Sequence, residues 1–258
     1  MTDLAVKIAY IGEGFHGSQR QPGLRTVESE ILRNLVTVYG TDDIEFSLKL
    51  ASRTDRGVNA LGNVAVFDAG DRDPDGLLKA LNGISRGVFY RSHAYVPEDF
   101  KPRYAHRRYY RYIMPAEGVD IKRAKKCASL FLGEHDFSRF CKYDGKPTMN
   151  NIVSSDIRIE EDFLIYDCGA RFFLWQQVRR MASAIAEVGL NRADYDDVTR
   201  ALNGEDIHLG TLRGDGLTLM DVEYMNVEFT KPVKTMYERK TGEESYRNKV
   251  RSLFFASL

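Results

Sequence analysis

Cysteine is scarce in this sequence, and long apolar runs are missing. The 258 residues include three cysteines, Cys127, Cys141 and Cys168, with no C-x-x-C pair among them. An odd number at wide spacing indicates reduced thiols rather than a disulfide framework or a zinc site. The apolar runs extend over only a few residues, as from Leu130 to Leu132, so no transmembrane helix is expected.

A secretory signal and a local metal motif are not apparent either. The first fourteen residues contain an acidic residue, Asp3, and only a short apolar run, so we expect a cytoplasmic protein. The histidines are few and far apart: His16, His93, His106, His135 and His208. Hydrophobic residues make up 43% of the chain and charged residues 29%, which is typical of a globular protein with a substantial core.

The sequence has no net charge, because 37 Lys and Arg residues balance 37 Asp and Glu residues. A neutral total argues against a nucleic-acid-binding protein, which usually has a basic excess. The charges are unevenly distributed, however. Residues 101–126 contain nine basic and two acidic residues, and residues 231–251 contain seven basic and three acidic ones. Each segment is compatible either with an ordinary solvated face or with contacts to phosphate groups.

Apolar periodicity predicts the order β-α-β-β-α-β twice along the chain. Thr26, Asp73 and Asp120 are suitable N-caps for helices that run to about residues 39, 81 and 132. Further helices are predicted over 174–188 and 195–202, and strands over 4–11, 44–50, 64–67, 88–96, 107–114, 152–159, 163–168 and 217–229. We therefore expect an α+β fold of two ferredoxin-like halves, residues 1–105 and 106–258, with mixed or antiparallel sheets flanking a central cleft.

Gly12, Gly14 and Gly17 form a G-x-G-x-x-G pattern directly after the first predicted strand. A dinucleotide-binding fingerprint requires the helix to begin at this loop, so that its N-terminus meets the pyrophosphate. Here residues 19–23 separate the glycines from the helix. We therefore favour a flexible loop that brings Gln19 and Arg20 to a polar partner.

The turn around Asp55 places one carboxylate between the guanidinium groups of Arg53 and Arg56. One interpretation is structural: Asp and Gly are common in hairpin turns, where Asp accepts hydrogen bonds from backbone amides. The other is catalytic, because neighbouring positive charge favours the ionised carboxylate that a nucleophile or general base requires. Composition alone does not separate the two interpretations.

Two further segments carry candidate functional residues. In residues 109–112, Tyr110 and Tyr112 share one face of a predicted strand, as either core residues or aromatic surfaces for stacking on an unstacked base. Arg179 lies on the flank of the apolar face of the helix over 174–188. From there its side chain can either reach a carboxylate in the other half or extend to solvent.

Taken together, these segments resemble the TruA family of tRNA pseudouridine synthases. The most specific match is Ser52-Arg53-Thr54-Asp55-Arg56-Gly57-Val58-Asn59-Ala60, and supporting matches lie at residues 7–10, 17–21, 27–28, 108–113, 133–140, 173–189 and 214–217. The resemblance covers nearly the whole chain in order. It implies that uridine in the anticodon arm of tRNA, commonly at positions 38 to 40, is isomerised to pseudouridine by a homodimer that needs no cofactor.

The resemblance also assigns roles to particular residues. It places the catalytic aspartate at Asp55, the active-site tyrosine at Tyr110, the basic partner of the aspartate at Arg179 and the base-displacing arginine at Arg53. We further expect Gln19, Arg20 and Arg108 to bind RNA. A uridine in a stacked arm must be extruded before an enzyme can act on it. Asp55 would then promote cleavage of the N1–C1′ bond, and the uracil would rejoin through C5.

The sequence departs from the family pattern at several positions. Arg56 and Asn59 replace the usual Ala and His around the aspartate, Ser18 replaces the usual Trp, and Gln176-Gln177 stand where His or Met is common. These departures affect how RNA is held rather than the catalytic set. A non-catalytic RNA-binding protein with RRM-like halves is the alternative, although residues 86–90 match an RNP1 strand only in part.

Overall fold

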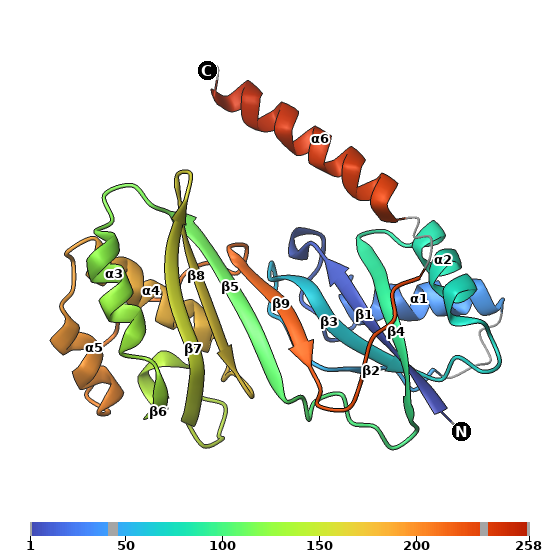
Figure 1. The fold of residues 1–258 in the computed structure, drawn as a ribbon, viewed down its shortest axis with the longest axis horizontal. Coiled ribbons are helices and arrows are strands. Elements are labelled where there is room, and N and C mark those ends of the chain that lie inside the picture. The colour runs from blue at the N-terminus through green and yellow to red at the C-terminus, as the bar shows by residue number, and fades with distance from the viewer. Residues whose placement is uncertain (1, 41–45, 233–236, 257–258) are drawn as a thin grey trace.

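One nine-stranded sheet runs through the molecule in the computed structural model, which describes residues 2–40, 46–232 and 237–256 (Figure 1). The strands are β1 Thr2–Tyr10, β2 Lys49–Leu50, β3 Asn59–Phe67, β4 Val88–Pro97, β5 Arg107–Pro115, β6 Gly133–Asp136, β7 Met149–Glu160, β8 Phe163–Ala170 and β9 Leu217–Glu223. Their order is β4-β1-β3-β9-β5-β8-β7-β6, and β2 pairs with β3. The helices are α1 Val27–Tyr39, α2 Pro74–Ile84, α3 Ile121–Ser129, α4 Gln177–Gly189, α5 Tyr195–Leu202 and α6 Tyr237–Ala256.

The sheet is continuous because β9, the last strand, pairs with both parts of the chain. It lies parallel to β3, with Ala60 opposite Leu219, and antiparallel to β5, with Leu219 opposite Tyr110. The other pairings among the named strands are antiparallel, which makes the sheet mixed. The predicted α+β class and mixed sheet are thus confirmed. The two sheets expected side by side are joined into one, since pairing with β9 satisfies the edge of β3.

The helix starts follow the predicted capping residues. Thr26 Oγ1 accepts a hydrogen bond from Ser29 N at 3.2 Å, and Asp73 Oδ2 accepts one from Gly76 N at 2.7 Å. Asp120 Oδ1 accepts one from Lys122 N at 2.8 Å. Each cap satisfies a backbone N–H group that has no partner within the helix. These three predictions are confirmed, and α5 has the predicted bounds.

Several elements differ from the sequence-based prediction, among them β3, which begins at Asn59 rather than at residue 64. Helix α4 begins at Gln177 rather than residue 174, because Gln176 has a left-handed backbone with φ of 64°. Strand β9 ends at Glu223, before the predicted end at 229. Strand β6 and helix α6 were not predicted, since neither has clear apolar periodicity. The predicted strand over 44–50 is observed at Lys49–Leu50, and residues 44 and 45 lie outside the described part of the chain.

The functional face of the sheet is fixed by strand register. Residues directly opposite each other on paired strands project to the same side. Tyr10 pairs with Ala60, Ala60 with Leu219, and Leu219 with Tyr110, so these four side chains share one face. Helices α1 and α2 lie over the β4 end of the sheet, and α3 and α4 lie over the β7 end (Figure 1).

The three cysteines are free thiols, as predicted, and all three are buried. Among the described residues, no helix is both long and apolar enough to cross a membrane.

Candidate active site

A cavity of about 750 Å³ opens over the central strands, and we call it the Asp55 cavity. Its walls come from loops, strands and the first turn of α4, which are far apart in sequence: residues 16–19 and 21, residues 51–56 and Val58, Arg103, Arg108, Tyr110, Asp144, Lys146, residues 172–179 and Leu217. It contains six of the chain's Arg and Lys side chains and two carboxylates, so cations predominate within a neutral protein. This composition suits an anionic substrate such as RNA.

The turn that carries Asp55 rests on a buried polar network. The Tyr10 hydroxyl lies 2.9 Å from Thr54 Oγ1, and Asn63 Nδ2 donates to the Tyr10 hydroxyl at 3.1 Å. Asn63 Oδ1 also accepts a hydrogen bond from Ser52 N at 3.1 Å. Because each buried polar group has partners, the network specifies one conformation of residues 52–54. The turn therefore presents Asp55 from a rigid base.

The glycine-rich loop packs directly against this turn. A Cβ atom at Gly12 would lie 2.4 Å from Gly57 C, and one at Gly17, where φ is 93°, would lie 3.0 Å from Thr54 O. Gly12 and Gly17 thus permit a close backbone approach that any side chain would prevent. The G-x-G-x-x-G pattern serves the Asp55 turn, and the helix α1 begins ten residues beyond Gly17. This arrangement agrees with the sequence-based argument against a dinucleotide site.

Both carboxylate oxygens of Asp55 are bonded to residues from the other end of the chain. Arg179 Nη1 donates to Oδ2 at 3.1 Å, and Trp175 Nε1 donates to Oδ1 at 3.1 Å. The Asp55 side chain is 34% exposed and that of Arg179 is 16% exposed. The ion pair between Asp55 and Arg179 therefore lies at the mouth of the cavity, where a nucleotide can reach the carboxylate.

The start of α4 explains how Arg179 and Trp175 reach the same carboxylate. Gln176 in the left-handed conformation turns the chain, so Trp175 precedes the helix and Arg179 lies in its first turn. The buried Gln177 side chain accepts a hydrogen bond from Leu174 N at 2.9 Å through Oε1. Arg179 Nε donates to Leu212 O at 2.7 Å, which fixes its guanidinium. The geometry of this segment thus favours one orientation of both donors.

Tyr110 forms part of the floor of the cavity. Its ring is buried and packs edge-on against Phe173 at 5.2 Å between centroids. Burial raises the pKa of the Tyr110 hydroxyl well above its ordinary value, so this group remains a neutral phenol at physiological pH. Within the described residues its oxygen has no hydrogen-bond partner, and it is free to meet a substrate.

The predicted RNA-binding residues occupy different places. Gln19 and Arg53 line the cavity, but Arg20 does not. The backbone N–H of Arg20 donates to the Glu28 carboxylate at 2.8 Å. The Arg108 side chain is buried and donates to Ser52 Oγ and to the carbonyl oxygens of Ala51, Arg103 and Arg171. Its guanidinium is thus directed at protein atoms and joins β5 to the Asp55 segment. Arg108 also lines the cavity, and its contact with RNA stays a prediction.

Sequence reasoning missed Trp175 as a site residue. The side chain is 42% exposed, and Lys142 Nζ lies 4.1 Å from the centroid of its ring. Lys142 N also donates to Trp175 O at 2.7 Å. The signal that could have identified it is its place four residues before Arg179, as the one tryptophan of the chain.

Two departures from the family pattern have structural partners in this chain. Ser18 is buried, and its Oγ accepts a hydrogen bond from Thr54 N at 2.8 Å. Asn59 accepts one from Gly12 N at 2.8 Å and donates to Asp215 O at 2.9 Å. Both residues therefore support the Asp55 turn. Over the described part of the chain, no group of three or more His, Cys, Asp or Glu side chains is arranged to hold a metal ion.

Comparison with known proteins gives a consistent result. The family model described as tRNA pseudouridine synthase matches residues 127–225. The tRNA pseudouridine synthase A of Pyrococcus abyssi is 38% identical over 253 residues, which cover 96% of this chain and 94% of that protein. The tRNA pseudouridine synthase A of Pyrococcus furiosus is 41% identical over 232 residues, covering 88% and 85%. That of Methanosphaera stadtmanae is 36% identical over 240 residues, covering 89% and 86%.

Proposed function

Since the chain belongs to the tRNA pseudouridine synthase family and is therefore an isomerase, we propose that it modifies uridines in the anticodon arm of tRNA, at positions 38 to 40. The observation that carries the proposal is the Asp55 carboxylate at the mouth of a predominantly basic cavity, held at 3.1 Å by Arg179. A carboxylate so placed can act on the ribose of a nucleotide whose base has entered the cavity.

The chemistry begins with extrusion of the target uridine from the stacked arm. Arg53 fills the space that the base leaves, and the Tyr110 ring contacts the flipped uracil. Asp55 acts at the ribose, as a nucleophile or as a base, and the N1–C1′ bond breaks. The uracil turns, C5 forms a bond to C1′, the C5 proton leaves and N1 gains a proton. Atoms balance without an oxidant, a reductant or a metal.

Arg179 and Trp175 have different parts in this sequence of steps. The ion pair with Arg179 orients Asp55 through Oδ2. Trp175 occupies Oδ1. For Asp55 to act through Oδ1, the indole must leave this oxygen when the nucleotide enters. Trp175 is therefore a positioning residue, and Arg179 is a partner of Asp55 throughout.

The proposal extends to the organisation of the chain. Residues 1–105 and 106–258 form two ferredoxin-like halves, the first with the catalytic aspartate and the second with Tyr110 and Arg179. The strand order β4-β1-β3-β2 in the first half and β9-β5-β8-β7 in the second supports this division, because both follow the fourth-first-third-second arrangement of a β-α-β-β-α-β unit. The protein acts as a homodimer, which light scattering at several concentrations would test.

The direct test is to incubate the protein with an unmodified tRNA transcript and to map pseudouridine at single-nucleotide resolution. We expect modification at positions 38 to 40 and release of the C5 proton from labelled uridine. Pseudouridine elsewhere in the tRNA would contradict the anticodon-arm assignment alone. The absence of any pseudouridine would contradict the proposed activity as a whole.

A further inference from the structure

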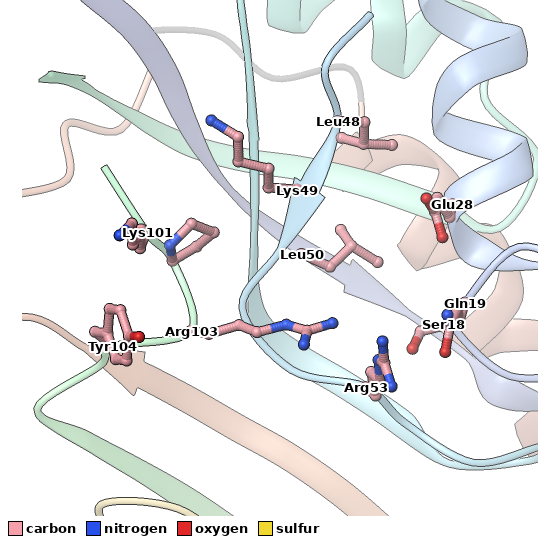
Figure 2. Close-up of a pocket in the computed structure, with 11 residues that line it drawn as sticks. Ser18, Gln19, Glu28, Leu48, Lys49, Leu50, Arg53, Lys101, Arg103 and Tyr104 are labelled. Atoms are coloured by element: carbon pink, nitrogen blue, oxygen red, sulfur yellow. The ribbon is translucent and has the colours of Figure 1, made fainter. Parts of the chain in front are cut away.

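A second cavity of about 430 Å³ adjoins the Asp55 cavity, and we call it the outer pocket (Figure 2). It is lined by Ser18, Gln19, Glu28, Leu48, Lys49, Leu50, Arg53, Lys101, Pro102, Arg103 and Tyr104. Four of these residues, Ser18, Gln19, Arg53 and Arg103, also line the Asp55 cavity. When one nucleotide of a polynucleotide occupies the Asp55 cavity, the adjacent nucleotide of the same strand would therefore lie in the outer pocket.

The charge of the outer pocket is strongly unbalanced. It has four cationic side chains and one carboxylate, that of Glu28. The Lys49 ammonium lies 3.6 Å from Asp3, but the Arg53 and Arg103 guanidinium groups have no ion pair or hydrogen bond within the described residues. Figure 2 shows these two groups extending from different segments toward the same open space. Like charges brought together without a counter-charge repel each other, and an anion between them removes this repulsion.

An aromatic surface lies beside these cations. Tyr104 is 72% exposed, and Lys101 Nζ lies 5.9 Å from the centroid of its ring. Leu48 and Leu50 add apolar lining. An exposed aromatic ring next to unpaired cations is the combination that binds single-stranded nucleic acid, because bases stack on the ring and phosphates meet the cations.

The backbone that presents these side chains is firmly held. Residues 101–104 connect β4 to β5, and the Tyr224 hydroxyl donates to Pro102 O at 2.6 Å. Arg108 Nη2 donates to Arg103 O at 2.9 Å, and Tyr104 N donates to Lys101 O at 2.9 Å. The segment is thus rigid while its side chains project freely. A preorganised segment of this kind loses little conformational entropy on binding.

We propose that the outer pocket binds the nucleotide adjacent to the target uridine, with its phosphodiester between Arg53 and Arg103 and its base against Tyr104. This inference rests on the proposed function, because it requires the uridine to occupy the Asp55 cavity. The pocket recognises a phosphate and the flat face of a base, so it accepts any of the four bases. It favours RNA in which the nucleotide beside the target is unpaired.

The first test uses Tyr104→Ala and Arg103→Ala, each checked by a melting curve. We expect tRNA binding to weaken roughly tenfold for Tyr104→Ala, which removes one stacked base. Arg103→Ala should also reduce the slope of log affinity against log salt by about 0.7 to 0.9, the value for one phosphate contact. Tyr95→Ala, at an exposed tyrosine outside both cavities, is the matched control and should bind tRNA as the unaltered protein does.

The second test identifies the phosphate directly. A synthetic stem-loop RNA carries a neutral methylphosphonate in place of the phosphodiester on the 5′ or the 3′ side of the target uridine. One of the two replacements should weaken binding to the unaltered protein and should cause a smaller loss with Arg103→Ala, in which Arg53 alone still contacts the phosphate. Additive losses for both replacements would overturn the proposal, as would a Tyr104→Ala variant with unchanged affinity. In either case pseudouridine formation by the unaltered protein would show that the proposed function stands independently.

Discussion

Trp175 and Asp55, 120 positions apart in the sequence, are joined by a hydrogen bond of 3.1 Å from the indole Nε1 to the carboxylate Oδ1. Arg179 already occupies Oδ2 at the same distance. The carboxylate is therefore bonded at both oxygens, and the bond to a neutral indole is the weaker of the two. Entry of a uridine is expected to displace Trp175 and to leave Arg179 in place.

The single tryptophan of the chain makes this displacement measurable. Because Trp175 is the one indole present, its fluorescence reports on the active site without labelling. We expect the emission to change in intensity and wavelength as tRNA is added, since the ring leaves Asp55 and Lys142. In Trp175→Phe, loss of one competing hydrogen bond of about 0.5–1.5 kcal/mol should lower the KM for tRNA roughly two- to tenfold at unchanged kcat. Emission unaffected by tRNA would mean that the indole remains on Asp55 during binding.

Much of the fold followed from local sequence signals. The capping residues Thr26, Asp73 and Asp120 have a physical role that involves only neighbouring residues, and their helices begin as predicted. Strand β9 shows the limit of such reasoning. Its alternation predicted a strand, but its position between β3 and β5 depends on pairing with strands more than a hundred residues away. One continuous sheet could therefore not be derived from periodicity.

In the candidate site, too, sequence identified individual residues but not the tertiary contacts between them. Asp55, Tyr110 and Arg179 were identified in the sequence, and all three line one cavity. The bond from Trp175 was not foreseen, because it depends on the left-handed backbone of Gln176. Arg108 was expected to bind RNA. Its burial against four protein oxygens is a tertiary contact that sequence alone does not reveal.

Gly12→Ala tests the close packing beneath the Asp55 turn. The added methyl group would meet the Gly57 backbone at 2.4 Å, so we expect a loss of about 1–3 kcal/mol in the free energy of unfolding, together with reduced activity. Gly83→Ala in α2 is the control, since its methyl group meets nothing within 4 Å. The free energy of unfolding of Gly83→Ala should rise by about 0.5–1 kcal/mol. Urea denaturation of both variants decides the point, and equal stabilities would contradict this view of the glycine loop.

Tyr110→Phe separates the hydroxyl of this residue from its ring. The ring contact with Phe173 is retained and no hydrogen bond within the described residues is lost, so stability and tRNA affinity should change little. Turnover should fall by a factor on the order of 10² if the phenol transfers a proton. Tyr112→Phe on the same strand is the opposite case. Its hydroxyl donates to Arg213 O at 2.8 Å, so the change should cost about 1 kcal/mol of stability and leave turnover intact.

Turnover should not depend on an added cofactor. The proposed isomerisation transfers no electrons, and Asp55, Tyr110 and Arg179 supply the groups that it requires. Extensive dialysis against a chelator, followed by assay in cofactor-free buffer, should leave the rate of pseudouridine formation unchanged. Recovery of lost activity on addition of zinc or NAD would instead require a different mechanism.

Asp55→Asn decides between the structural and the catalytic interpretations of the turn. Asparagine has nearly the same shape and keeps a carbonyl acceptor for the Trp175 or the Arg179 donor, so a purely structural turn should tolerate it. An amide cannot act as a carboxylate nucleophile or base, and we expect turnover to fall by about 10²–10⁴-fold or more.

The same variant should remain folded and should bind tRNA at least as tightly as the unaltered protein, because one negative charge near the phosphates is removed. Asp206→Asn is the matched control. Asp206 also pairs with an arginine, Arg139, at 2.7 Å, and it lies outside both cavities. Breaking that exposed pair should cost at most about 1 kcal/mol of stability and leave turnover unchanged. Melting curves, binding isotherms and pseudouridine assays on the same preparations make the comparison. Full turnover in Asp55→Asn would exclude a catalytic carboxylate at this position, and unfolding of Asp55→Asn alone would favour the structural interpretation.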